Sequence, residues 1–133
     1  MASQTMCILF SESYGVSPNE LASERTLATV PFAGRYRLID FILSSLVKAK
    51  ISNIVTPFAK AETANTRNRS AIDALLSARG YIEMCDEDYI ILSDTNQVMN
   101  VDFTGMIKSH IEREADITLL YQNHDEAIHN GVV

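Results

Sequence analysis

The segment of residues 30–41, with the sequence VPFAGRYRLIDF, constrains the fold of this chain more than any other stretch. Pro31 lacks a backbone N–H group and biases the preceding Val30 toward an extended conformation. Gly34 can adopt the positive φ angle that a tight turn often requires. We therefore expect a short extended run and a tight Ala-Gly turn, followed directly by a helix.

The helix after this turn is predicted over residues 38–49. Its apolar residues leave little polar face, so we expect it to be largely buried; they are Leu38, Ile39, Phe41, Ile42, Leu43, Leu46 and Val47. Arg35 and Arg37 stand immediately before the helix, where charged side chains are usually solvated.

The rest of the chain alternates between strand-like and helix-like segments. Ser70 and Asp73 form a capping-box pattern that predicts a second helix, and Asp102 suits the start of a third. Four short apolar runs have the length and composition of strands, at residues 5–10, 53–58, 89–92 and 117–121. Pro57 is expected to mark the end of the second of these strands. This alternation predicts an α/β fold, a doubly wound and mostly parallel sheet.

In a sheet of this kind, ligands bind at the carboxyl ends of the strands. Those ends are predicted at Ser11, Pro57 and Ser93 and the residues that follow each of them. The candidate site therefore consists of three polar segments that are far apart in the sequence.

Composition excludes several classes of protein. The net charge of −6 argues against a general nucleic-acid-binding surface, and no apolar run approaches the roughly 20 residues that span a bilayer. The N-terminus lacks the features of a secretory signal. Cys7 and Cys85 lack metal-site spacing and are predicted to be reduced thiols of a cytoplasmic protein.

The central stretch also carries a resemblance. VPFAGRYRLIDFILSS resembles the segment VPFGGxYRLIDFxLSN of the glucose-1-phosphate adenylyltransferases, also called ADP-glucose pyrophosphorylases. The resemblance implies a Rossmann-like, GT-A-like nucleotidyltransferase domain. An active member of that family, with Mg²⁺, makes ADP-glucose and pyrophosphate from ATP and glucose 1-phosphate.

The nucleotide-binding loop departs from the family pattern. In the family, the first strand leads into GGxGxRLxPLT and then RxKPAVPF; here it leads into SESYGVSPNELASERTLATVPF. Gly15 is the one glycine that remains, and Arg25 matches the arginine of RxKP. Leu27 stands at the lysine position and cannot offset phosphate charge, whereas Glu12 adds a negative charge near the expected phosphates.

Two further strand ends also depart from the pattern. The family has TQY after the second strand; here Thr56 matches, but Pro57 replaces the glutamine that reads the base. The family ends its third strand with SGDH, whose aspartate holds the metal. Thr95 takes that position here, and whether Asp94, one residue earlier, substitutes for the aspartate stays open.

These departures resemble the non-catalytic, regulatory GlgD type of subunit, which works with a catalytic subunit in glycogen biosynthesis. We therefore expect a hetero-oligomer, no nucleic-acid or membrane partner, no catalytic residue and no metal site, and leave open a sugar-phosphate or nucleotide effector. The remnant nucleotide-binding positions are Gly15, Arg25, Thr56, Asp94 and Thr95. The alternative is an active enzyme with a differently aligned loop, which would need ATP and Mg²⁺.

The resemblance covers essentially the whole chain but only part of the family's length. Residues 1–133 are expected to form one partial nucleotidyltransferase-like domain, the N-terminal part, without the family's C-terminal β-helix. The family has a much longer segment between Phe58 and Ser70, and whether its shortening here is a deletion or reflects disordered residues left out of the sequence stays open. A chain of this extent should expose a sheet edge and self-associate. A receiver-type signalling domain phosphorylated at Asp94 is a weaker alternative, because only Glu12 follows the first strand.

Overall fold

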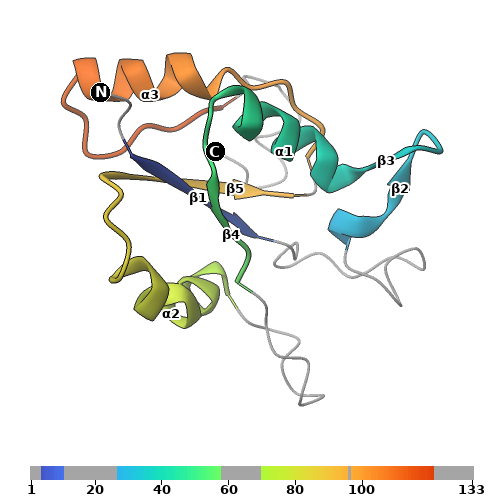
Figure 1. Ribbon diagram of the computed structural model, residues 1–133, viewed down its shortest axis with the longest axis horizontal. Coiled ribbons are helices and arrows are strands. Elements are labelled where there is room, and N and C mark those ends of the chain that lie inside the picture. The colour runs from blue at the N-terminus through green and yellow to red at the C-terminus, as the bar shows by residue number, and fades with distance from the viewer. Residues whose placement is uncertain (1–3, 11–26, 58–69, 96, 122–133) are drawn as a thin grey trace. The chain divides into compact units, whose positions relative to one another are not determined.

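The computed structural model describes residues 4–10, 27–57, 70–95 and 97–121 (Figure 1). It divides into two compact units, Met1–Asp102 and Phe103–Val133. The first unit is built on a three-stranded parallel sheet with the order β4-β1-β5. The predicted α/β class with parallel strands is confirmed.

The central strand of the sheet is β1 (Thr5–Phe10), and all six of its residues are buried. It pairs on one side with β4 (Asn53–Val55) and on the other with β5 (Tyr89–Asp94). A continuous apolar run suits this place, because both faces of a central parallel strand are covered. The predicted first strand is therefore confirmed with its bounds.

The other two strands differ in length from the prediction. The strand β4 ends at Val55, two residues before Pro57, which was expected to mark its end because it has no N–H group to extend the ladder. By contrast, β5 continues two residues beyond the predicted end. Its last residues, Ser93 and Asp94, pair with Leu9 and Phe10 of β1.

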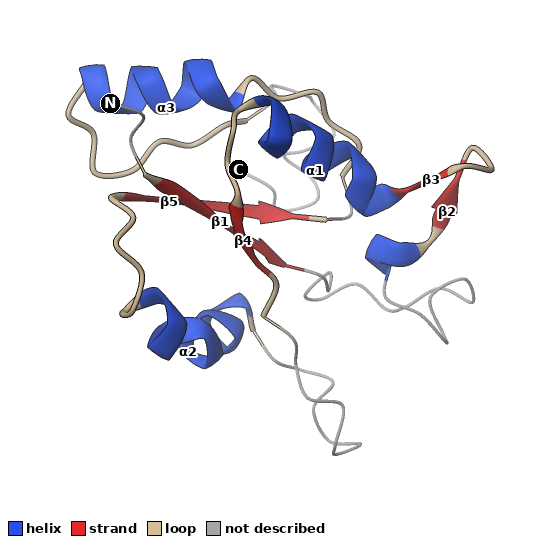
Figure 2. Ribbon diagram, viewed as in Figure 1, coloured by secondary structure: helices blue, strands red, loops and turns tan. Residues whose placement is uncertain are grey.

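Two helices of this unit lie on opposite faces of the sheet, as Figure 2 shows for α1 (Leu38–Lys48) and α2 (Ala71–Ile82). Right-handed crossovers require this, because the chain moves from β1 outward to β4 and then back across β1 to β5. Met6 and Ile8 of β1 pack against Ala74 of α2. The sheet is therefore doubly wound, as predicted.

The prediction that α1 is largely buried is confirmed for one face of the helix and wrong for the other. Ile42, Ser45 and Leu46 are buried, whereas the side chain of Val47 is 69% exposed. The apolar composition of the helix therefore overstated its burial.

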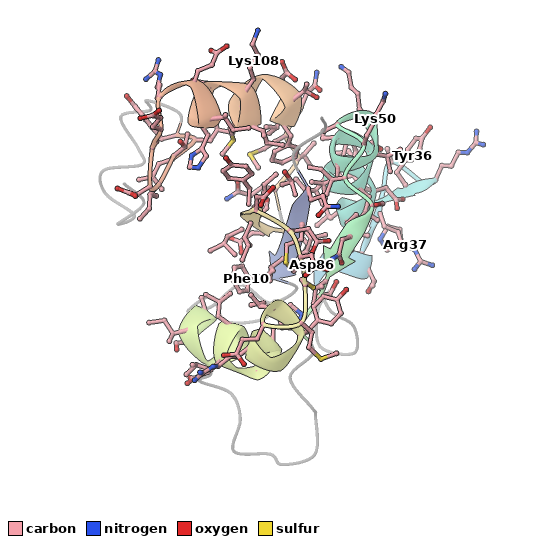
Figure 3. All side chains as sticks on the ribbon, turned by 60° about the vertical axis from the view of Figure 1, so that its left-hand side comes forward. Phe10, Tyr36, Arg37, Lys50, Asp86 and Lys108 are labelled. Atoms are coloured by element: carbon pink, nitrogen blue, oxygen red, sulfur yellow. The ribbon has the colours of Figure 1, made fainter. Side chains whose placement is uncertain are left out.

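The predicted extended run and tight turn are present as a two-stranded hairpin after a short 3₁₀ helix, η2 (Leu27–Thr29). The strands are β2 (Pro31–Phe32) and β3 (Tyr36–Arg37), and the turn residues Ala33 and Gly34 have φ angles of 52° and 78°. Arg35 and Arg37 are exposed, as expected, and Figure 3 shows Arg37 beside Tyr36 on this hairpin.

An aromatic contact attaches the hairpin to α1. The ring of Phe41 meets that of Phe32 edge to face, with centroids 5.4 Å apart, and the ring of Tyr36 at 6.4 Å. The backbone N–H of Arg37 donates to the Asp40 carboxylate at 2.8 Å, which satisfies one of the free donors at the start of α1. The hairpin and the helix therefore form one structural element.

The helix α2 begins with the predicted capping box. The backbone N–H of Asp73 donates to the hydroxyl of Ser70 at 3.3 Å, and the N–H of Ser70 donates to the Asp73 carboxylate at 3.1 Å. These reciprocal bonds define the start of the helix.

The second unit contains α3 (Phe103–Glu112), which begins directly after Asp102 as predicted. The predicted fourth strand at residues 117–121 is absent, because no described residue of this unit offers a ladder partner. Thr118 instead lies 2.7 Å from the ring nitrogen Nδ1 of His110 on α3. No helix within the described ranges is long and apolar enough to cross a membrane.

Candidate functional site

The carboxyl end of the sheet in the first unit is where the fold would hold a ligand. Phe10 and Asp94 are opposite each other at the ends of β1 and β5, and Thr56 follows the end of β4. The predicted positions Gly15 and Arg25 lie outside the described residues, as does Glu12. The structure therefore places Thr56, Asp94 and Thr95 at this edge.

Thr95 is a buried structural residue at this edge, with 1% of its surface exposed. Its hydroxyl donates to the carbonyl oxygen of Phe10 at 3.0 Å, and its backbone N–H donates to the same oxygen at 3.1 Å. The side chain thus continues the β1–β5 pairing by one position. A carboxylate at this position would face a carbonyl oxygen, which repels it.

Asp94 is half-buried, and burial raises the pKa of its carboxyl above the ordinary value. No ion pair or side-chain hydrogen bond joins its carboxylate to any other residue in the ranges that the structure describes. The cause of the shift is the loss of hydration without a compensating cation. Asp94 is thus an acidic group at the predicted edge of the sheet, without a charged partner among the described residues.

A magnesium ion does not fit the described part of this edge. Mg²⁺ needs octahedral oxygen coordination, usually with one or two carboxylates and substrate phosphates. Thr95 commits its hydroxyl to Phe10, and no group of three or more acidic, histidine or cysteine side chains gathers among the described residues. Asp94 is the one candidate ligand from the predicted positions.

The end of β4 likewise lacks the hydrogen-bonding groups that would bind a nucleotide base. Thr56 and Pro57 are half-buried, and Pro57 has neither an amide side chain nor a backbone N–H. Leu27, at the lysine position of the resembled pattern, opens η2 and supplies no charge. Within the described ranges, the edge therefore has hydroxyl and apolar groups where triphosphate chemistry needs cations.

A polar network at the opposite, amino end of the sheet was missed by sequence reasoning. The Tyr81 hydroxyl donates to Oδ1 of Asn53 at 2.8 Å, and Nδ2 of Asn53 donates to the Glu87 carboxylate and approaches Sγ of Cys85 at 3.7 Å. The network links α2, β4 and the turn before β5. Asn53 lies 28 to 34 positions before the other three members, so no local pattern signals the network.

Comparison with known proteins identifies curated relatives, although no family model matches the chain. The "Glycogen biosynthesis protein GlgD" of Bacillus subtilis (strain 168) is 26% identical over 156 residues, covering 90% of this chain and 44% of the relative. The protein of the same name from Geobacillus stearothermophilus is 27% identical over 150 residues, covering 89% of this chain and 43% of the relative.

A further relative is named for an enzyme activity. The "Glucose-1-phosphate adenylyltransferase" of Bacillus thuringiensis (strain Al Hakam) is 22% identical over 169 residues, covering 100% of this chain and 45% of the relative. The alignments are longer than the 133 residues of the chain, so each relative carries residues that this chain lacks. The chain spans less than half the length of these relatives.

Proposed function

This chain belongs to the ADP-glucose pyrophosphorylase family, and on that premise we propose that it is a regulatory, non-catalytic chain of glycogen biosynthesis. It acts by associating with a catalytic subunit of the same family rather than by turning over substrate itself. Residues 1–133 then correspond to the N-terminal part of one nucleotidyltransferase-like domain.

The observation that carries the proposal is the hydrogen bonding of Thr95. Its hydroxyl and its backbone N–H both donate to the carbonyl of Phe10, at the position where the family pattern has a metal-binding aspartate. Metal-assisted transfer at the α-phosphate needs an anionic ligand for the ion. A buried hydroxyl that is already bonded cannot serve in that role, and this supports a chain without its own chemistry.

The scaffold around this position supports a role in association. The hairpin and α1 keep the family sequence VPFAGRYRLIDF almost unchanged, while Leu27, Pro57 and Thr95 replace functional positions. A chain that packs beside a catalytic relative would retain the surfaces of that fold and lose the chemistry. The two GlgD relatives are named for glycogen biosynthesis, which is consistent with that role.

The alternative is an active nucleotidyltransferase that forms ADP-glucose and pyrophosphate from ATP and glucose 1-phosphate. One observation favours it: Asp94 presents, at the carboxyl end of β5 and one position from Thr95, a carboxylate that no described residue pairs with. In that case Asp94 would bind Mg²⁺ in place of the missing aspartate.

A pyrophosphate-release assay separates the two functions. The purified chain is incubated with ATP, glucose 1-phosphate and Mg²⁺, alone and with a catalytic family member such as the Bacillus thuringiensis relative. We expect no release by the chain alone, and a changed rate or effector response of the catalytic member in its presence. The loss of one charge-stabilising group costs on the order of 10²–10³ in rate, so several losses leave nothing measurable.

The matched variants are Asp94→Asn and Asp86→Asn, which remove one carboxylate at the end of β5 and one in the turn before it. Turnover by the chain alone that is lost in Asp94→Asn and kept in Asp86→Asn would establish the active enzyme. Co-purification without any complex, together with an unchanged rate of the catalytic member, would remove the regulatory proposal.

A further inference from the structure

No further inference is drawn: the strongest candidate, the side-chain cluster around Asn53 at the amino end of the sheet, carries nothing, because its polar groups bond to one another and Cys85 is a single thiol, with no second feature among the described residues that points to a ligand.

Discussion

At the scale of single residues, the turn of the hairpin holds an alanine in a conformation that favours glycine. Ala33 has a φ angle of 52°, and Gly34 after it has 78°. An L-residue in the left-handed region costs roughly 1–2 kcal/mol because its Cβ crowds the backbone, and glycine escapes that cost. The resembled family has glycine at the position of Ala33.

Ala33→Gly should therefore stabilise the protein by about 1 kcal/mol, measured as the free energy of unfolding in urea. Gly34→Ala is the matched reverse change and should destabilise it, although no described atom lies within 4 Å of the new Cβ. An unchanged stability of Ala33→Gly would show that the turn relaxes without strain.

The two cysteines should differ sharply in reactivity. Burial of Cys7 in the central strand raises the pKa of its thiol to about 12, whereas Cys85 is half-buried. Because the thiolate is the nucleophile, Cys7 should stay unreactive at pH 8 in the native protein. A chromogenic disulfide reagent should label one thiol; Cys85→Ser should abolish this labelling and Cys7→Ser should not.

Asp94 should make stability fall as pH rises. Burial raises the pKa of its carboxyl in the folded state above the ordinary value of 3.8, so the folded protein holds the proton more tightly than the unfolded chain. Stability is then unaffected well below pH 3.8 and decreases as pH rises through the folded pKa. Asp94→Asn should be more stable than the wild type at pH 7, with a difference that vanishes in acid.

Urea unfolding of both proteins across this pH range is the measurement, and Asp86→Asn, at an exposed carboxylate, is the control. A difference between wild type and Asp94→Asn that grows toward acid pH would mean that a cation compensates the Asp94 carboxylate.

At the scale of the helix, two neighbouring apolar residues of α1 differ in their burial. Leu46 is fully buried, and Val47 beside it is 69% exposed. Leu46→Ala removes buried methyl groups and leaves a cavity, which should cost about 2–5 kcal/mol. Val47→Ala should change the free energy of unfolding by less than about 0.5 kcal/mol. Equal losses in the two variants would mean that another element covers Val47.

At the scale of the whole molecule, protection of the backbone amides from hydrogen exchange should be highest in the central strand β1 and lower in the strand beside it. Exchange of the β1 amides should require global unfolding, because β1 is buried on both faces and paired on both sides. Amides of β4, with three residues and one neighbour, should exchange faster. Native-state hydrogen exchange in low denaturant measures both, and equal protection of β1 and β4 would contradict this order.

Local sequence patterns predicted much of this fold because each depends on residues close together in the chain. The continuous apolar run ending at Phe10 predicted a strand buried on both faces, and the capping box at Ser70 predicted the start of a helix; the structure has both. Exposure of Val47 and the two-residue extension of β5 depend on neighbours that are distant in the sequence. For the same reason, residues 117–121 have strand composition without a strand partner.

At the candidate site, too, the sequence predicted local features but not the contacts between residues that are distant along the chain. The substitution at Thr95 was visible as a departure from a family pattern, but its bond to Phe10 spans 85 positions and required the structure. The network around Asn53 had no signal at all in the sequence, because its members come from three separate elements.

The pair of bonds from Thr95 to Phe10 also limits what a single substitution can introduce at this edge of the sheet. In Thr95→Asp, the new carboxylate would enter a buried position beside the carbonyl oxygen that threonine now satisfies, and the two oxygens would repel each other. A carboxylate ligand at this position would therefore need changes in the surrounding residues as well.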